Sequence, residues 1–365
     1  MNRVRLVSGS NEKGPACVLV DAGTQRLLLD FGDGPEPGRR PDLAGIGAVD
    51  ALLLSHGHRD HTGSLALASE VGNPPLWCTK PVAAMLPANT TSAVHALPLT
   101  GECEVAGIRV RTGRNGHAPG GVWLHLTLHG GDLLYTGDYS VESPVYAFDP
   151  PPLATVAVVD ASYGDYDTPL GDAVQALVDR LGPAPDALLP VPPGGRGPEI
   201  AWWLATRCRL PVQLGDDLRA AIDRLCGEAH ASVKPEVLDA LAGLARHAPP
   251  LSDAPGVRLT GSADGSSGDS ATWIARLADR RSVTLVFTGY LPPGTPAQQL
   301  TAQGRAHYLR WNVHPRRRDV VDLARQTGVH HLLPAFGGHA QMAQMRKAIA
   351  PAALVLAPSF EWGAR

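Results

Sequence analysis

Residues 55–63 read Ser-His-Gly-His-Arg-Asp-His-Thr-Gly and directly follow the apolar run 49–54, Val-Asp-Ala-Leu-Leu-Leu. The apolar run predicts a buried strand. Four potential metal ligands therefore lie at the carboxyl end of a strand, namely His56, His58, Asp60 and His61. Imidazole and carboxylate at this density are typical of zinc sites, with manganese or iron as alternatives.

The spacing of these four side chains favours a metal centre. In an extended segment His56 and His58 project to the same side and can reach one ion, while Asp60 and His61 begin the next turn and can face a second. Gly57 permits a tight bend between the first two ligands. A solvated histidine-rich loop is the alternative, but such loops do not usually follow a buried strand with this spacing.

The H-x-H-x-D-H arrangement resembles the signature of the metallo-β-lactamase fold, a four-layer αββα hydrolase scaffold. This resemblance implies the fold and the metal, and leaves the substrate to be argued from the rest of the chain. It implies that His117 supplies a third imidazole to the first ion and that Asp138, in Thr136-Gly137-Asp138, bridges two ions. Asp30, at the end of a predicted strand, would support the metal loop.

Four later segments resemble motifs of the β-CASP branch of this family, which includes ribonuclease J and mRNA 3′-end processing endonucleases. In chain order they are 156–164, 189–199, 260–268 and 287–295. The alternation of helices and apolar strands between them predicts an inserted α/β domain. We therefore expect an α/β protein, an αββα sandwich formed by residues 1–170 and 295–365, with a β-CASP-like insert over 171–294.

Residues 308–314 resemble a further characteristic segment of this branch. The resemblance implies that the last residue of the segment, His314, approaches the scissile phosphate. Arg310, Arg316 and Arg317 belong to the basic cluster around it and are the predicted phosphate contacts. A solvated arginine-rich face is the alternative interpretation.

The chain departs from the ribonuclease pattern at 329–339, Val-His-His-Leu-Leu-Pro-Ala-Phe-Gly-Gly-His. Ribonuclease members typically have His-Gly-Glu after this strand, and that His binds the second metal. Alignment on the glycine places Phe336 at this position, as DNA-processing members place an apolar residue. His339, or less readily His331, is the predicted substitute ligand.

Composition narrows the functional class. The chain has 365 residues, 44% of them hydrophobic, and a net charge of -3, so no global basic field would attract a polyanion. Its five scattered cysteines indicate reduced thiols in a cytoplasmic protein. No run reaches the ~20 apolar residues that a membrane span needs, so no membrane partner is expected.

The leading hypothesis is a nuclease, a ribonuclease or exonuclease, in which a hydroxide shared by two zinc ions attacks the phosphodiester. Asp60 and His314 are the predicted catalytic residues, and single-stranded RNA or DNA is the predicted partner. A homodimer is expected by analogy with relatives. The alternatives are a small-molecule metallohydrolase acting on a thioester, lactone or cyclic nucleotide, and a binding subunit with a degenerate site.

Overall fold

The computed structural model describes residues 1–34, 36, 38–87, 90 and 92–363. The chain divides into two compact units. The first unit comprises Met1–Val141, Ala147–Asp167 and His314–Arg365, and the second comprises Glu142–Tyr146 and Thr168–Val313.

Two seven-stranded sheets form the first unit, and the first of them begins at the amino terminus. In spatial order its strands are β19 (Ser359–Trp362), β1 (Asn2–Ser8), β2 (Cys17–Ala22), β3 (Gln25–Leu29), β4 (Ala51–Leu53), β5 (Leu76–Cys78) and β6 (Val94–Ala96). β3, β4, β5 and β6 run parallel, and β1 is antiparallel to both of its neighbours.

The second sheet has the spatial order β18 (Ala353–Leu354), β17 (His331–Ala335), β11 (Val156–Asp160), β10 (Leu133–Tyr135), β9 (Val122–Thr127), β8 (Ile108–Arg114) and β7 (Gly101–Val105). Residues 101–114 form two strands of this sheet with a turn between them. Ala106 and Gly107 both have positive φ and form a two-residue turn, so the segment is the hairpin β7–β8.

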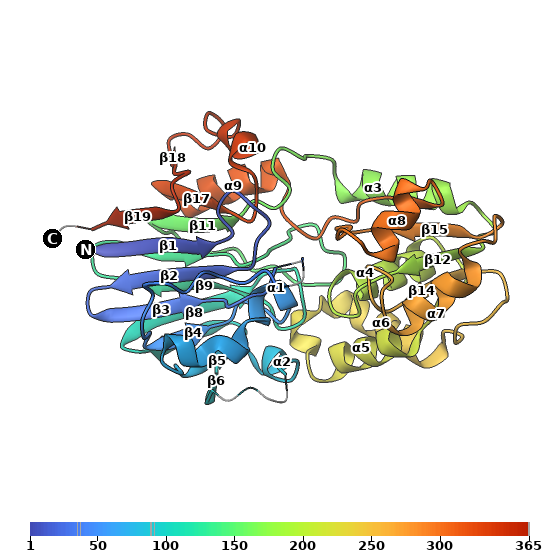
Figure 1. Ribbon diagram of the computed structural model, residues 1–365, viewed down its shortest axis with the longest axis horizontal. Coiled ribbons are helices and arrows are strands. Elements are labelled where there is room, and N and C mark those ends of the chain that lie inside the picture. Colours follow the sequence, from blue (N-terminus) through green and yellow to red (C-terminus); the bar gives the residue numbers. More distant parts are fainter. Residues whose placement is uncertain (35, 37, 88–89, 91, 364–365) are drawn as a thin grey trace. The chain divides into compact units, whose positions relative to one another are not determined.

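The two sheets pack face to face, and helices cover both outer faces (Figure 1). α1 (Arg59–Thr62), a 3-10 helix (Leu65–Val71) and α2 (Lys80–Ala83) lie on the first sheet, where Leu65 and Val82 pack with Leu28 and Leu52. α9 (Arg317–Thr327) and α10 (His339–Ala343) lie on the second sheet, where Val320 packs with Val159. The predicted αββα sandwich is therefore confirmed.

The second unit is built on a parallel sheet of five strands, in the order β13 (Val212–Leu214), β14 (Val257–Thr260), β12 (Ala187–Pro190), β15 (Thr284–Phe287) and β16 (Ala306–Tyr308). Alternate residues of β12 face opposite sides, so Leu189 packs in one core cluster and Leu188 in another.

Helices cover both sides of this sheet. The cluster around Leu189 includes α3 (Leu170–Leu181), α4 (Arg196–Trp202) with its π-helical extension (Trp203–Arg207), α5 (Asp216–Gly227) and α6 (Pro235–His247). A short 3-10 helix (His230–Ser232) joins α5 to α6. The cluster around Leu188 includes α7 (Gly268–Leu277) and α8 (Pro296–Ala302).

The second unit extends beyond the predicted insert at both ends. β16 pairs with β15, which keeps the segment up to Val313 in this unit rather than ending it at 294. The segment 142–146 also belongs to it, because Tyr146 donates from its hydroxyl to the carbonyl of Gly195 at 2.9 Å and Lys234 donates to that of Ser143 at 2.7 Å.

Strand direction places polar residues at one edge of each sheet in the first unit. β3 and β4 are parallel, so Asp30 and Ser55, just beyond their carboxyl ends, come together. β10, β11 and β17 are also parallel, so Asp138 after β10, Asp160 at the end of β11 and Phe336 after β17 lie at the same edge.

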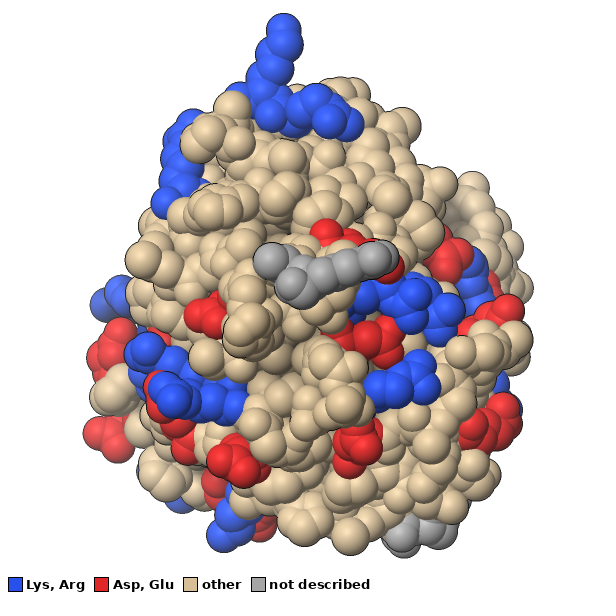
Figure 2. Space-filling model, turned by 90° about the vertical axis from the view of Figure 1, so that its left-hand side faces the viewer, with Lys and Arg blue, Asp and Glu red and all other residues tan. Residues whose placement is uncertain are grey.

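Charge is mixed over the middle and lower part of the face shown in Figure 2, where Lys and Arg side chains lie among Asp and Glu, and only Lys and Arg side chains are seen at its top. Among the residues that the structure describes, no helix combines the length and apolarity needed to cross a bilayer. All five cysteines are free thiols.

Glu199 of α4 is a buried carboxyl group in the second unit. Trp311 Nε1 donates to it at 2.7 Å, and the hydroxyl of Ser143 donates to its other oxygen. Burial raises the pKa of Glu199 to about 7, and these two hydrogen bonds oppose the rise. The folded protein therefore binds a proton at pH values where the unfolded chain has lost it.

This raised pKa predicts a pH-dependent stability. Between the ordinary pKa of 4.5 and about 7 the folded state holds more protons, so the free energy of unfolding falls as pH rises, by on the order of 3 kcal/mol from this group. Glu199→Gln lacks this loss, so relative to wild type it should gain stability between pH 5 and pH 8 in urea unfolding. Glu228→Gln, at an exposed carboxyl group of the same unit, should follow the wild type; equal behaviour of the two variants would contradict the prediction.

Candidate metal centre

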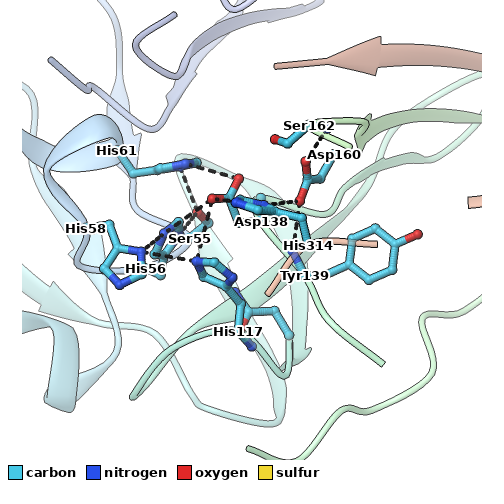
Figure 3. Close-up of polar contacts among 12 residues, drawn as sticks. Ser55, His56, His58, His61, His117, Asp138, Tyr139, Asp160, Ser162 and His314 are labelled. Atoms are coloured by element: carbon cyan, nitrogen blue, oxygen red, sulfur yellow. Dashed lines mark hydrogen bonds and ion pairs between the residues drawn. The ribbon is translucent and has the colours of Figure 1, made fainter. Parts of the chain in front are cut away.

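Three imidazoles converge at the edge of the first unit where β4 ends (Figure 3). His56 Nε2 lies 3.1 Å from His58 Nδ1, and His117 Nε2 lies 3.1 Å from the same atom. His56 and His117 are buried, and His58 is partly buried. The three histidines predicted for the first ion are thus brought together from two segments.

Asp138 lies beside this group and follows β10 by three residues. Its Oδ2 is 3.6 Å from His117 Nε2 and 3.9 Å from His56 Nε2, and its Oδ1 is 3.3 Å from His61 Nε2. Burial acts to raise the pKa of Asp138, but the facing His61 and His314 outweigh it and hold that pKa well below its usual range. Asp138 therefore stays a carboxylate in a buried position.

Asp30 supports the ligand loop through hydrogen bonds. Its carboxylate accepts hydrogen bonds from the backbone and hydroxyl of Ser55 at 2.7 and 2.6 Å, from the Tyr135 hydroxyl at 2.6 Å and from His61 Nδ1 at 2.7 Å. Asp30 is fully buried. This geometry matches the supporting role expected for Asp30, since hydrogen bonds from outside the ligand set orient ligands and tune their basicity.

The pKa values of two neighbouring buried imidazoles are shifted in opposite directions, because their neighbours differ. Burial and the adjacent imidazoles of His61, His58 and His117 hold the pKa of His56 well below its usual value, so His56 is neutral. His61 lies between the carboxylates of Asp138 and Asp30, which raise the pKa of His61 well above its usual value although burial acts to lower it. A neutral imidazole is the form that binds metal.

His314 also lies at this centre, and it begins the last segment of the first unit, His314–Arg365. Its Nδ1 donates to Asp160 Oδ2 at 2.9 Å and lies 3.6 Å from Asp138 Oδ2. Its ring also packs against His117 and Tyr163, at centroid distances of 5.1 Å in both cases. Asp160 ends β11 and therefore orients a histidine more than 150 residues away.

The two other predicted ligands are not brought into this group. The described part of the chain contains three groups of three potential ligand atoms, and the atoms of each group lie within 4.8 Å of one another. Neither Asp60 nor His339 belongs to any of these groups. His339 Nε2 instead lies 3.3 Å from the hydroxyl of Ser10. Phe336 follows β17, and its ring lies edge-on to His61 at 5.4 Å between centroids.

The predicted phosphate contacts are largely engaged elsewhere. Arg316 makes a bidentate pair with Asp319 at 2.8 Å for each nitrogen, at the start of α9. Arg317 is about half exposed and lies 3.6 Å from Asp167. Arg310 belongs to the second unit and donates to the Tyr308 hydroxyl at 3.3 Å. Of the three, Arg317 makes the loosest contact.

Three residues of this centre were not predicted. Ser55 precedes the first ligand directly, and its hydroxyl lies 3.1 Å from His56 Nδ1, where it fixes the ring. Asp160 is visible in the sequence as an acidic residue at a strand end, but its pairing with His314 is not. Tyr135 carries no local signal, because its bond to Asp30 spans the two sheets.

The donor set fits a divalent metal ion. Three imidazole nitrogens that face one another, one of them on a neutral buried ring, form the ligand pattern of zinc and related ions. An ionised carboxylate beside them offers the negative charge that a dication needs in a buried place.

Comparisons with known proteins show what this chain is similar to. Residues 11–191 match the model of the metallo-beta-lactamase superfamily. A ribonuclease of Thermus thermophilus is 28% identical over 88% of this chain and 84% of that protein. The transcription termination factor FttA of Methanococcus maripaludis is 23% identical over 94% of this chain and 64%, just under two thirds, of its own length. A protein of unknown function from Enterococcus faecalis has a similar fold, with a TM-score of 0.60 at 16% identity over 100% of this chain and 99% of that one.

The hydrogen bonds of Asp30 predict a large effect of its removal. Asp30→Ala leaves buried donors of Ser55, His61 and Tyr135 without an acceptor, so it should lower the free energy of unfolding by roughly 3–5 kcal/mol. It should also weaken the binding of a divalent ion, with zinc as the probe, by about 10–100-fold. Urea unfolding and a zinc competition assay measure the two effects.

Tyr135→Phe is the matched control, because it removes one of these bonds and leaves the others. It should lower the free energy of unfolding by about 1–2 kcal/mol and leave zinc binding close to wild type. If Asp30→Ala binds zinc as tightly as Tyr135→Phe, Asp30 does not support the centre.

Proposed function

Because this chain belongs through residues 11–191 to the metallo-β-lactamase superfamily, we propose that it is a metal-dependent nuclease cleaving single-stranded RNA. The family predicted from the motifs is confirmed, and relatives of the β-CASP branch carry the names ribonuclease and transcription termination factor. The observation that carries the proposal is the buried group His56, His58 and His117 beside the carboxylate of Asp138. Zinc is the proposed ion, and the free cysteines favour the proposed cytoplasmic location.

The ion would supply a water activated for attack at neutral pH and a positive charge for the phosphate oxygens. His56, His58 and His117 would hold it, with the Ser55 hydroxyl fixing the ring of His56. Asp138 supplies the ionised carboxylate at the same place, and His61 holds one of its oxygens.

His314 is the proposed proton donor. In the imidazolium form that the proposal requires, Nδ1–H donates to Asp160, and Nε2–H remains to donate to a phosphate or leaving oxygen. Asp160 is thus a positioning residue, since it fixes which nitrogen of His314 faces the substrate. Asp60, predicted as catalytic, lies outside the three groups of ligand atoms, so the proposal gives it no step.

Cleavage assays test the proposal directly. The zinc-loaded protein is incubated with end-labelled single-stranded RNA and DNA of one sequence, and we expect the RNA to be cut. His58→Gln should reduce cleavage to background because it removes the imidazole that faces both partners. His95→Gln changes an exposed histidine outside the centre and should keep wild-type activity.

Other results of this assay would change the function. Cleavage of DNA alone would move the substrate to DNA, as the apolar Phe336 predicts. Cleavage of neither polymer by protein that holds zinc would reject the nuclease in favour of a small-molecule metallohydrolase. Absence of stoichiometric zinc would favour a binding subunit with a degenerate site.

His314→Gln should lower turnover by roughly 10²–10⁴-fold while the zinc content stays that of the wild type. Asp160→Asn should also lower turnover, but it should cost little more when His314 is already replaced, because Asp160 acts through that imidazole. Turnover and zinc content of both single variants and the double variant form the test. Loss of zinc from His314→Gln would make His314 a ligand instead, and independent effects of the two changes would remove the positioning role of Asp160.

A further inference from the structure

We propose that this centre holds one divalent ion per chain, at His56, His58 and His117, and that Phe336 closes the position of a second. The inference rests on the proposed function for the presence of an ion, and goes beyond it in fixing the number of ions. It also makes His61 a positioning residue for Asp138 rather than a ligand.

Phe336 occupies the space beside the imidazole predicted for the second ion. Its side chain is 4% exposed, and its ring meets the ring of His61 edge-on, at 69° between planes. A carbon-only ring offers no lone pair to an ion. On this side His61 is thus packed against an apolar wall.

The backbone holds Phe336 in this position. Its N–H donates to the carbonyl of Gly9 at 2.7 Å, and the next residue, Gly337, forms an isolated parallel β-bridge with Ser10. A Cβ on Gly9 would lie 2.7 Å from Phe336 Cδ1, so the ring lies directly on the Gly9 backbone. Phe336 also has φ of +65°, a strained conformation for a bulky residue that surrounding contacts must maintain. The ring therefore cannot easily move aside for an ion.

Counting donor atoms leads to the same number. His56 Nε2 and His117 Nε2 both face His58 Nδ1, so these three nitrogens are assigned to the first ion, and the other nitrogen of His56 lies at the Ser55 hydroxyl. The two other groups of ligand atoms each take a member of the first group, His56 in one and His117 in the other.

With those members assigned to the first ion, the second position keeps His61 and Asp138. His314 Nδ1 is engaged with Asp160 at 2.9 Å. Asp60 and His339 belong to none of the groups within the described residues. One imidazole and one carboxylate fall short of the three protein ligands that a zinc site usually has.

His61 has a different task in this arrangement. Its Nδ1 meets Asp30 at 2.7 Å and its Nε2 faces Asp138 Oδ1 at 3.3 Å. Both nitrogens are thus directed at carboxylates, and His61 links the buried Asp30 to Asp138. This link holds Asp138 beside the three imidazoles.

Metal content per chain tests the inference without reference to activity. Wild type, Phe336→His and Phe336→Leu are loaded with excess zinc, dialysed and measured by mass spectrometry of the metal against protein concentration. We expect one zinc in wild type and in Phe336→Leu, and two in Phe336→His, which adds an imidazole beside His61. Two zinc ions in wild type would overturn the inference, and one in folded Phe336→His would overturn the part assigned to Phe336.

The role of His61 is tested by the same measurement. His61→Gln should keep one zinc per chain, with weaker binding because Asp138 loses its partner, whereas His58→Gln should hold none. Loss of zinc from His61→Gln as complete as from His58→Gln, with both variants folded by circular dichroism, would show that His61 is a ligand.

These outcomes separate the inference from the proposed function. A wild type that holds one zinc and cleaves neither polymer leaves the count intact and rejects the nuclease. A wild type that holds two and cleaves RNA keeps the nuclease and rejects the count. A wild type that holds none rejects both.

Discussion

The buried carboxylate of Asp30 is the contact on which the rest of the centre depends. A charge without solvent is stable only when hydrogen-bond donors surround it, and Ser55, His61 and Tyr135 supply those donors. In satisfying Asp30, these residues fix the loop that carries His56 and His58, the ring of His61 and, through Tyr135, the second sheet. Stability and ligand geometry therefore rest on the same bonds.

The sandwich brings this contact about through strand direction. Asp30 and Ser55 follow parallel neighbours of one sheet, and Asp138 and Asp160 lie at the carboxyl ends of parallel neighbours of the other. Polar loops that would be far apart along the chain thus meet at one end of the two sheets. Leu29 and Tyr135, which end strands next to these loops, belong to the one hydrophobic core that both sheets share.

What the sequence could predict follows from how local each signal is. The signals for the loop after β4 and for the helix-strand alternation of the second unit each lie within short segments, so the sequence alone can predict them, whereas the position of Asp60 outside the groups of ligand atoms depends on tertiary structure. The pair Asp160 and His314 joins residues 154 positions apart, so no local pattern shows it. The arginines near His314 were predicted as phosphate contacts from their clustering, but Asp319 and Asp167 pair with two of them through the fold of α9 and its neighbouring loop. A cluster of arginines in the sequence predicts a positive electrostatic potential, whereas the carboxylates that pair with these arginines are set by the tertiary structure.

In a centre with one ion, a side chain must stabilise the leaving oxygen. Where two ions are present, one can stabilise the leaving oxygen, but here Phe336 closes that side with an apolar ring. The group that remains for the leaving oxygen is His314, held by Asp160 at 2.9 Å and in ring contact with His117. His314 lies beside the three imidazoles. Such a position is required if the ion and His314 are to act on the same phosphate group, the ion on its oxygens and His314 on the leaving oxygen. Phe336 and the Asp160–His314 pair are thus two sides of one arrangement, in which a side-chain acid takes the place of a second cation.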